Sequence, residues 1–210
     1  MKIRLEMSDL GLLTYYLGIE VNQQGNGITL KQEAYAKNIL VKTRMLDCNP
    51  TKSPMEHKLS LTKDGDEELV NPTEYRSIVG CLRHLTHTRP DITFAVGVVS
   101  RFMEKPSIKH LQAVKGILRY VKGTLNYGLV YSKGGEKVTI SGFTDSDLVK
   151  DINDRRSTGG MAFHVNGNLV TWASQKQRVV ALSSCEAEFI VATMAACQGI
   201  WLRRLLTEIT

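Results

Sequence analysis

The sequence predicts a mixed α+β fold in which a β-hairpin and a helix come first, a helical region follows, and a β-β-β-α unit ends the chain. Apolar residues alternate around Gly25-Asn26-Gly27, which is hairpin spacing with turn residues in place. Between residues 73 and 122 they recur every three or four positions, as on helices, and alternation returns after residue 136. At 210 residues and 42% hydrophobic, the chain can bury a core.

The N-terminal part is expected to form a hairpin over residues 15–31 and an amphipathic helix over 32–45. Residues 46–72 contain three prolines and an acidic run, so we expect an extended connection there. Helical spacing over 73–87 and 90–103 predicts two helices, with Pro90 in the first turn of the second.

A helix predicted over residues 107–122 is apolar on one side and positive on another, where Lys115, Arg119 and Lys122 line up. The whole positive excess of the chain lies in this region: residues 101–137 carry eight positive and two negative side chains, and the parts on either side are balanced. Two interpretations stay open, a face that is simply solvated and a face that contacts the phosphates of a polyanion.

The last third of the chain changes to a strand pattern, and a domain boundary is expected near 133–136. The turn Asn166-Gly167-Asn168 predicts a hairpin between the second and third strands. A long helix is expected from about Ser184 nearly to the end. The predicted strands cover residues 138–143, 159–165 and 169–173.

Acidic residues gather where the first of these strands ends. Asp145 and Asp147 close the strand, and Asp151 and Asp154 follow, which places four carboxylates within ten residues. Such a cluster either binds a cation or reflects ordinary turn chemistry.

Two glutamates at the start of the long helix differ in role. Ser183 and Glu186 have the spacing of a capping box. Glu188 lies two positions further on, about 200° around the helix, and has no local partner. It is therefore available to point across at the strand that carries Asp145.

Several short words in this chain resemble successive motifs of one family. GFTDSD, DRRSTGG, TWASQKQ and ALSSCEAEF, which begin at residues 142, 154, 171 and 181, resemble the ribonuclease H domain of copia-type retrotransposons. Upstream, MSDLG, YLGIEV, YRSIVG, TRPDI and LRYVKGT, which begin at residues 7, 16, 75, 88 and 118, resemble the end of the reverse transcriptase in the same Pol polyproteins. The resemblance covers essentially the whole chain, and many words in one order make it specific.

The resemblance implies three parts. Residues 1–45 are expected to be the C-terminal remnant of the reverse transcriptase palm, and residues 46–132 a connection with a helical, thumb-like region. Residues 136–210 are expected to be a ribonuclease H-like domain, truncated after its first long helix.

The resemblance also implies a nuclease site. In the family, two divalent cations, Mg²⁺ or Mn²⁺, cleave the RNA strand of an RNA-DNA hybrid. Asp145 matches the metal-bridging aspartate and Glu188 the helix glutamate, so both are implied as catalytic and metal-binding. The family's third aspartate belongs beyond Thr210, and its polymerase motif Tyr-x-Asp-Asp belongs before Met1. We therefore expect weak or no metal binding, no catalysis by this chain, an open sheet edge and an uncovered apolar side of the long helix.

An RNA-DNA hybrid or duplex nucleic acid is the implied partner, possibly together with the rest of the Pol polyprotein. The positive face, including Lys109, would contact phosphates. Arg155, Arg156 and Ser157 keep the family pattern and are candidates for backbone contacts, although an exposed arginine pair in a turn explains them as well. After its aspartates the family commonly has Asp-Trp-Ala-Gly, whereas this chain has Asp147-Leu148-Val149-Lys150.

The alternatives are a nucleic-acid-binding or recruited interaction protein without catalysis, and a genomic relic without function. We interpret Trp172 and Trp201 as core residues rather than as platforms for base stacking. The four cysteines show no CxxC spacing, no signal peptide is visible, and no run of 18 apolar residues occurs. We expect an intracellular protein, cytoplasmic or nuclear, that is not secreted and does not contact a membrane.

Overall fold

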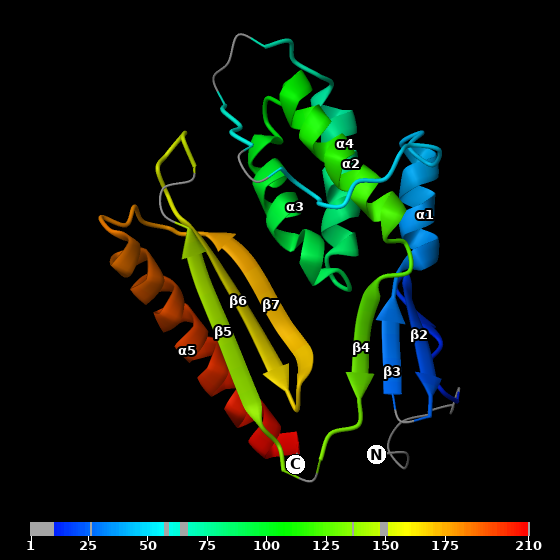
Figure 1. Cartoon of the computed structure of the whole chain (residues 1–210), viewed down its shortest axis with the longest axis vertical. Coiled ribbons are helices and arrows are strands. Elements are labelled where there is room, and N and C mark those ends of the chain that lie inside the picture. The colour runs from blue at the N-terminus through cyan, green and yellow to red at the C-terminus, as the bar shows by residue number, and fades with distance from the viewer. Residues whose placement is uncertain are drawn as a thin grey trace, which may run out of the picture.

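The computed structural model describes residues 11–25, 27–56, 59–63, 67–135, 137–147 and 151–209. Within these residues the fold is mixed α+β, with two antiparallel sheets and five α-helices. Helices α1 to α4 gather at one end, and the two sheets lie below them (Figure 1). The fifth helix, α5, runs along the three-stranded sheet on its outer side (Figure 1).

The first sheet has the order β1-β2-β3-β4. The predicted hairpin is confirmed, since β2 and β3 pair with Val21 opposite Leu30; Asn26 of the predicted turn lies outside the described residues. The fourth strand was not predicted: it pairs with β3 although it comes about a hundred residues later in the chain. The strands are β1 (Tyr15–Tyr16), β2 (Ile19–Gln24), β3 (Gly27–Lys31) and β4 (Gly128–Ser132).

The helical part forms at the predicted places. It comprises α1 (Glu33–Lys42), α2 (Pro72–Leu85), η1 (Pro90–Ile92), α3 (Thr93–Val99), η2 (Ser100–Phe102) and α4 (Ile108–Gly123). Leu40 of α1 is buried in one core with Leu82 of α2 and Ile117 of α4. The division expected at residue 45 therefore does not separate two cores, because α1 closes the same apolar cluster as the later helices.

The second sheet has the order β5-β6-β7 and carries α5 on one face. Phe163 packs against Ala195 and Leu202 of the helix. At Gly159 an added Cβ would lie 2.2 Å from a methyl group of Val191, so only a glycine allows α5 this close to the sheet. The elements are β5 (Ile140–Asp147), β6 (Thr158–Val165), β7 (Asn168–Lys176) and α5 (Ser184–Ile209).

Within the described residues, apolar side chains on the outer side of α5 are exposed, as expected. Phe189 is 73% exposed, and Trp201, which we expected in the core, is 55% exposed. In the described part of the chain β5 pairs with β6 alone, so its other edge is open. Among the described helices, α5 alone has the length and apolarity of a membrane span, and helices of soluble proteins can share both properties.

Candidate functional site

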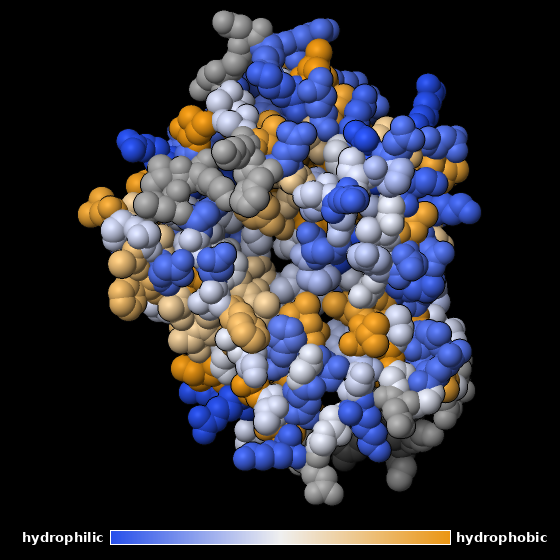
Figure 2. All heavy atoms as spheres, viewed as in Figure 1, coloured by the Kyte–Doolittle hydropathy of each residue, from blue (hydrophilic) through white to orange (hydrophobic). Residues whose placement is uncertain are grey.

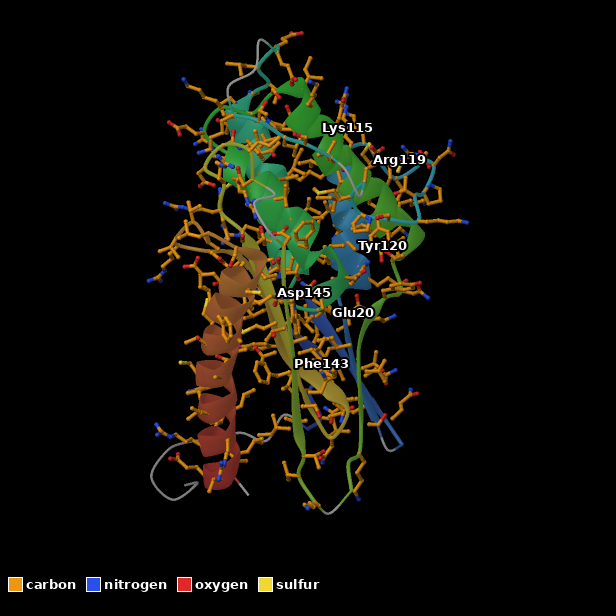
Figure 3. The ribbon with its side chains drawn as sticks, turned by 60° about the vertical axis from the view of Figure 1, so that its left-hand side comes forward. Glu20, Lys115, Arg119, Tyr120, Phe143 and Asp145 are labelled. Atoms are coloured by element: carbon orange, nitrogen blue, oxygen red, sulfur yellow. The ribbon has the colours of Figure 1, made fainter. Side chains whose placement is uncertain are left out.

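A groove of about 830 Å³ runs between α4 and the connection that follows α1. Four basic residues, Lys52, Lys109, Lys115 and Arg119, line it, with Glu56 as the acidic residue among the lining. Figure 3 shows Lys115 and Arg119 one turn apart on α4, away from Asp145 on β5, and hydrophilic side chains cover much of the helical end in Figure 2. We call this channel the basic groove.

The basic side chains of the basic groove differ in the contacts that they make. The Nε of Arg119 donates to the carbonyl oxygen of Asn49 at 2.8 Å, so this side chain also fixes the connection against α4. Lys109 pairs with Glu67, and the hydrogen bond from Lys109 lowers the pKa of that carboxyl group. Within the described residues, Lys115 makes no such contact and is exposed. Lys115 is therefore the helix cation most available to a ligand.

The structure changes the membership of the predicted positive face. Lys122 is half-buried in the last turn of α4 and does not line the groove. Lys52 does line it, but sequence reasoning missed it because it lies in an irregular segment without helical periodicity. The one sequence signal was its position between Pro50 and Pro54, since an exposed position is expected in an extended connection.

Of the predicted carboxylate pair, Glu188 reaches the open edge of the second sheet. An oxygen of Glu188 accepts a hydrogen bond from the backbone N–H of Ser146 at 3.2 Å, so the glutamate does reach the strand that carries Asp145. The local reason is the helix start: Glu186 N–H donates to Ser183 Oγ, which confirms that half of the capping box and leaves Glu188 on another side of the helix.

Asp145 and Glu188 approach this edge from different directions. Ser146 pairs with Gly159, which faces α5, and Asp145 pairs with Gly160. Because side chains alternate along a strand, the Asp145 side chain points to the sheet face opposite α5. In the described residues no third Asp, Glu, His or Cys joins them to form a metal-binding group.

The other two aspartates of the acidic cluster are ion-paired rather than arranged around a cation. Asp151 is 6% exposed and binds Arg101 at 3.0 Å and Lys176 at 2.5 Å, and Lys176 also reaches Asp154 at 2.7 Å. Burial alone would raise the pKa of Asp151, but the hydrogen bonds from Lys176 and Asn153 outweigh it and hold the pKa far below its ordinary value. The reading of Asp151 and Asp154 as metal ligands is thus not supported, because cations of the chain already neutralise them.

The three residues Arg155, Arg156 and Ser157 do not form one surface. Arg155 is exposed and has a left-handed backbone (φ 58°), with its N–H on the carbonyl of Asp151. The guanidinium of Arg156 turns towards Asp154, 3.8 Å away. Ser157 is fully buried, so its side chain is not presented to a nucleic acid in this structure.

Comparison with known proteins gives the family. Residues 1–57 match the model for reverse transcriptase (RNA-dependent DNA polymerase). The chain is 38% identical to the retrovirus-related Pol polyprotein from transposon RE1 of Arabidopsis thaliana, over 98% of this chain and 14% of that protein. It is also 37% identical to an uncharacterized mitochondrial protein of the same plant, over 93% of this chain and 80% of that protein. This chain belongs to the copia-type retrotransposon Pol polyproteins.

A third relative is the retrovirus-related Pol polyprotein from transposon TNT 1-94 of Nicotiana tabacum, 39% identical over 97% of this chain and 16% of the relative. This chain thus spans about one seventh of the length of the transposon polyproteins that it matches. No solved structure matches it.

Two of the motifs that resemble the family, TRPDI and LRYVKGT, contact each other in the structure. Arg89 is 2% exposed and donates two hydrogen bonds to Thr124, at 2.9 Å to its carbonyl and 2.6 Å to its hydroxyl. The same guanidinium binds Asp91 at 2.7 Å, and the hydroxyl of Tyr120 donates to Asp91 at 2.9 Å. Sequence reasoning gave these residues no role, because the two words lie about thirty residues apart.

Proposed function

We propose that the basic groove binds the sugar-phosphate backbone of a nucleic acid without reading its sequence. The observation that carries the proposal is that Lys52, Lys115 and Arg119, from two separate parts of the chain, line one channel and have no ion pair among the described residues. Lysine and arginine contacts to phosphates fix a nucleic acid in place but carry no base information. A Pol polyprotein acts on nucleic acid, so membership in this family supports the proposal.

The variant that tests the groove replaces Lys52 and Lys115 with glutamine. Both side chains line the groove, whereas Arg119 and Lys109 are left in place because they hold Asn49 and Glu67. Each lost phosphate contact lowers the slope of log affinity against log salt by about 0.9 on duplex. We therefore expect the slope to fall by about 1.8, measured by fluorescence anisotropy with a labelled RNA-DNA hybrid.

The matched control replaces Lys37 and Lys133, two exposed lysines outside the groove, with glutamine. It changes the net charge by the same amount, so a general field effect would weaken binding in both variants alike. Equal salt slopes for the two variants would contradict the groove as the binding site.

We propose further that Asp145 and Glu188 belong to a ribonuclease H centre for RNA-DNA hybrids. The supporting observation is the hydrogen bond from Ser146 N–H to Glu188, which brings the glutamate to the residue next to Asp145. Carboxylate oxygens suit Mg²⁺, and the cations, when bound, would activate water and stabilise the leaving oxygen. In the described residues no third carboxylate joins Asp145 and Glu188, and these two leave the sheet edge in different directions, so they would hold such a cation weakly. We therefore propose that this chain by itself is inactive.

The nuclease proposal is tested with Mn²⁺ binding, followed by electron paramagnetic resonance, and with cleavage of a labelled hybrid. We expect weak Mn²⁺ binding that Asp145→Asn and Glu188→Gln each reduce, and no cleavage. Glu208→Gln, in the last turn of the same helix, serves as the control and should leave Mn²⁺ binding unchanged. Mn²⁺ binding that is indifferent to Asp145 and Glu188 would refute the centre, and cleavage that Asp145→Asn removes would refute the inactivity.

A further inference from the structure

A second cleft, of about 590 Å³, lies between the helical part and the second sheet. Its helix side comes from α2, α3 and the residues between them, and its sheet side from β7. It shares no lining residue with the basic groove. The residues that decide its chemistry are Arg83, His87, Thr93, Ser100, Trp172 and Ser174. We call it the Trp172 cleft.

Trp172 supplies an aromatic surface on one wall. It pairs with Ala162, whereas the neighbouring Phe163 packs on α5, so alternation directs Trp172 to the opposite face of the sheet. There it lines the cleft and remains half-buried, which leaves part of the indole accessible. Its interpretation as a plain core residue is therefore incomplete.

Two basic side chains stand on the helix wall of the same cleft. Arg83 lies in the last turn of α2 and His87 in the turn that follows the helix, and both are exposed. In the described ranges Arg83 has no ion pair, although the chain neutralises Arg89 and Arg101 nearby with aspartates. A cation without a counter-ion inside a cleft favours an anionic ligand.

Hydroxyl groups complete the lining. Thr93 and Ser100 lie on the helix side, and Ser174 lies two residues from Trp172 on the same face of β7. The hydroxyls of Thr93 and Ser100 donate to the carbonyls of Arg89 and Val96, which leaves their oxygens as acceptors. The cleft therefore offers a ring for stacking, a cation for a phosphate, and acceptor oxygens for polar groups between them. An unpaired nucleotide can contact all of these groups at the same time, because it carries a base, a sugar and a phosphate.

We propose that the Trp172 cleft takes a nucleotide of single-stranded nucleic acid, with the base against Trp172 and the phosphate at Arg83 and His87. A duplex does not fit this chemistry, because its bases are stacked on each other and shielded from a side-chain ring. The cleft is thus a second site, which separates recognition of unpaired strand from the backbone contacts proposed for the basic groove.

The two tryptophans of the chain, Trp172 and Trp201, make a direct optical test possible. Trp201 is exposed on α5, so Trp201→Phe leaves Trp172 as the single reporter. In this background we expect a short oligo(dT) to quench the emission of Trp172 and a blunt duplex of equal phosphate number to leave it unchanged. Adding Arg83→Gln and His87→Gln should weaken the oligo(dT) titration about tenfold.

Two further variants separate this site from the proposed function. Lys52→Gln with Lys115→Gln removes groove cations, and should leave the quenching titration within about twofold if the cleft binds independently. Arg203→Gln with Arg204→Gln removes two exposed charges of α5 and should also leave it unchanged. Acrylamide quenching of each variant shows that Trp172 keeps its environment.

Three results would overturn the cleft proposal: no quenching by oligo(dT), equal quenching by the duplex, or a titration that the change of Arg83 and His87 leaves unaltered. If the basic groove does not bind nucleic acid, the Lys52/Lys115 variant instead shows an unchanged salt dependence of its affinity for the RNA-DNA hybrid. The two proposals can therefore fail separately.

Discussion

Asp91→Asn is expected to lower the free energy of unfolding by about 3 kcal/mol, because it leaves the buried charge of Arg89 without its partner. Arg89 is 2% exposed, and its guanidinium makes three contacts to the two oxygens of Asp91, at 2.9, 3.3 and 2.7 Å. Burial alone would raise the pKa of Asp91, but the bonds from Arg89 and Tyr120 lower it overall. The carboxylate is therefore the form that the fold requires.

The measurement is a urea unfolding curve followed by far-UV circular dichroism. Asp47→Asn is the matched control, since Asp47 is exposed and lies outside this network. Arg89→Lys should also destabilise the protein, because an ammonium group cannot bind Asp91 and Thr124 with the same planar fork. If Asp91→Asn and Asp47→Asn unfold at the same urea concentration, the pair does not stabilise the helical part.

Asp151→Asn is expected to lower the free energy of unfolding by about 2–3 kcal/mol at neutral pH, because Arg101 and Lys176 lose a buried anionic partner. The effect is smaller than for Asp91→Asn, since both cations keep some access to water. This aspartate joins η2 to the second sheet, because it binds Arg101 of η2 and Lys176 of β7. Arg101 also donates to the hydroxyl of Thr158 on β6 at 2.9 Å. The loss should therefore appear as weaker attachment of the two parts.

The same residue predicts the direction of the pH dependence. Because the pKa of Asp151 is lower in the folded protein than in the unfolded chain, its contribution is complete above the unfolded value of about 3.9. As the pH falls below that value, the unfolded state takes up a proton first and the stabilisation is lost. Wild type should lose stability in acid more steeply than Asp151→Asn, as measured by urea unfolding across the acid range. Parallel pH profiles would count against the proposed ion-pair role.

Local elements of this protein follow from the sequence because their causes are local. Alternation and the Gly25-Asn26-Gly27 turn predict the β2-β3 hairpin, and the spacing of Ser183 and Glu186 predicts where α5 begins. The family words identify the chain, and Glu188 was expected to point towards the strand of Asp145 because nothing near it in sequence could bind it.

The strand pairing, burial and ion pairs described above depend on the tertiary structure, because they are set by which distant surfaces come together. The pairing of β4 with β3 joins segments about a hundred residues apart, and no local pattern encodes that partner. Four aspartates in a row of ten residues look alike in sequence, yet Arg101 and Lys176 reach Asp151 only because η2 and β7 pack beside it. In the same way Ser157 became buried, Lys52 joined the cations of α4, and Trp172 came to face a cleft instead of a closed core.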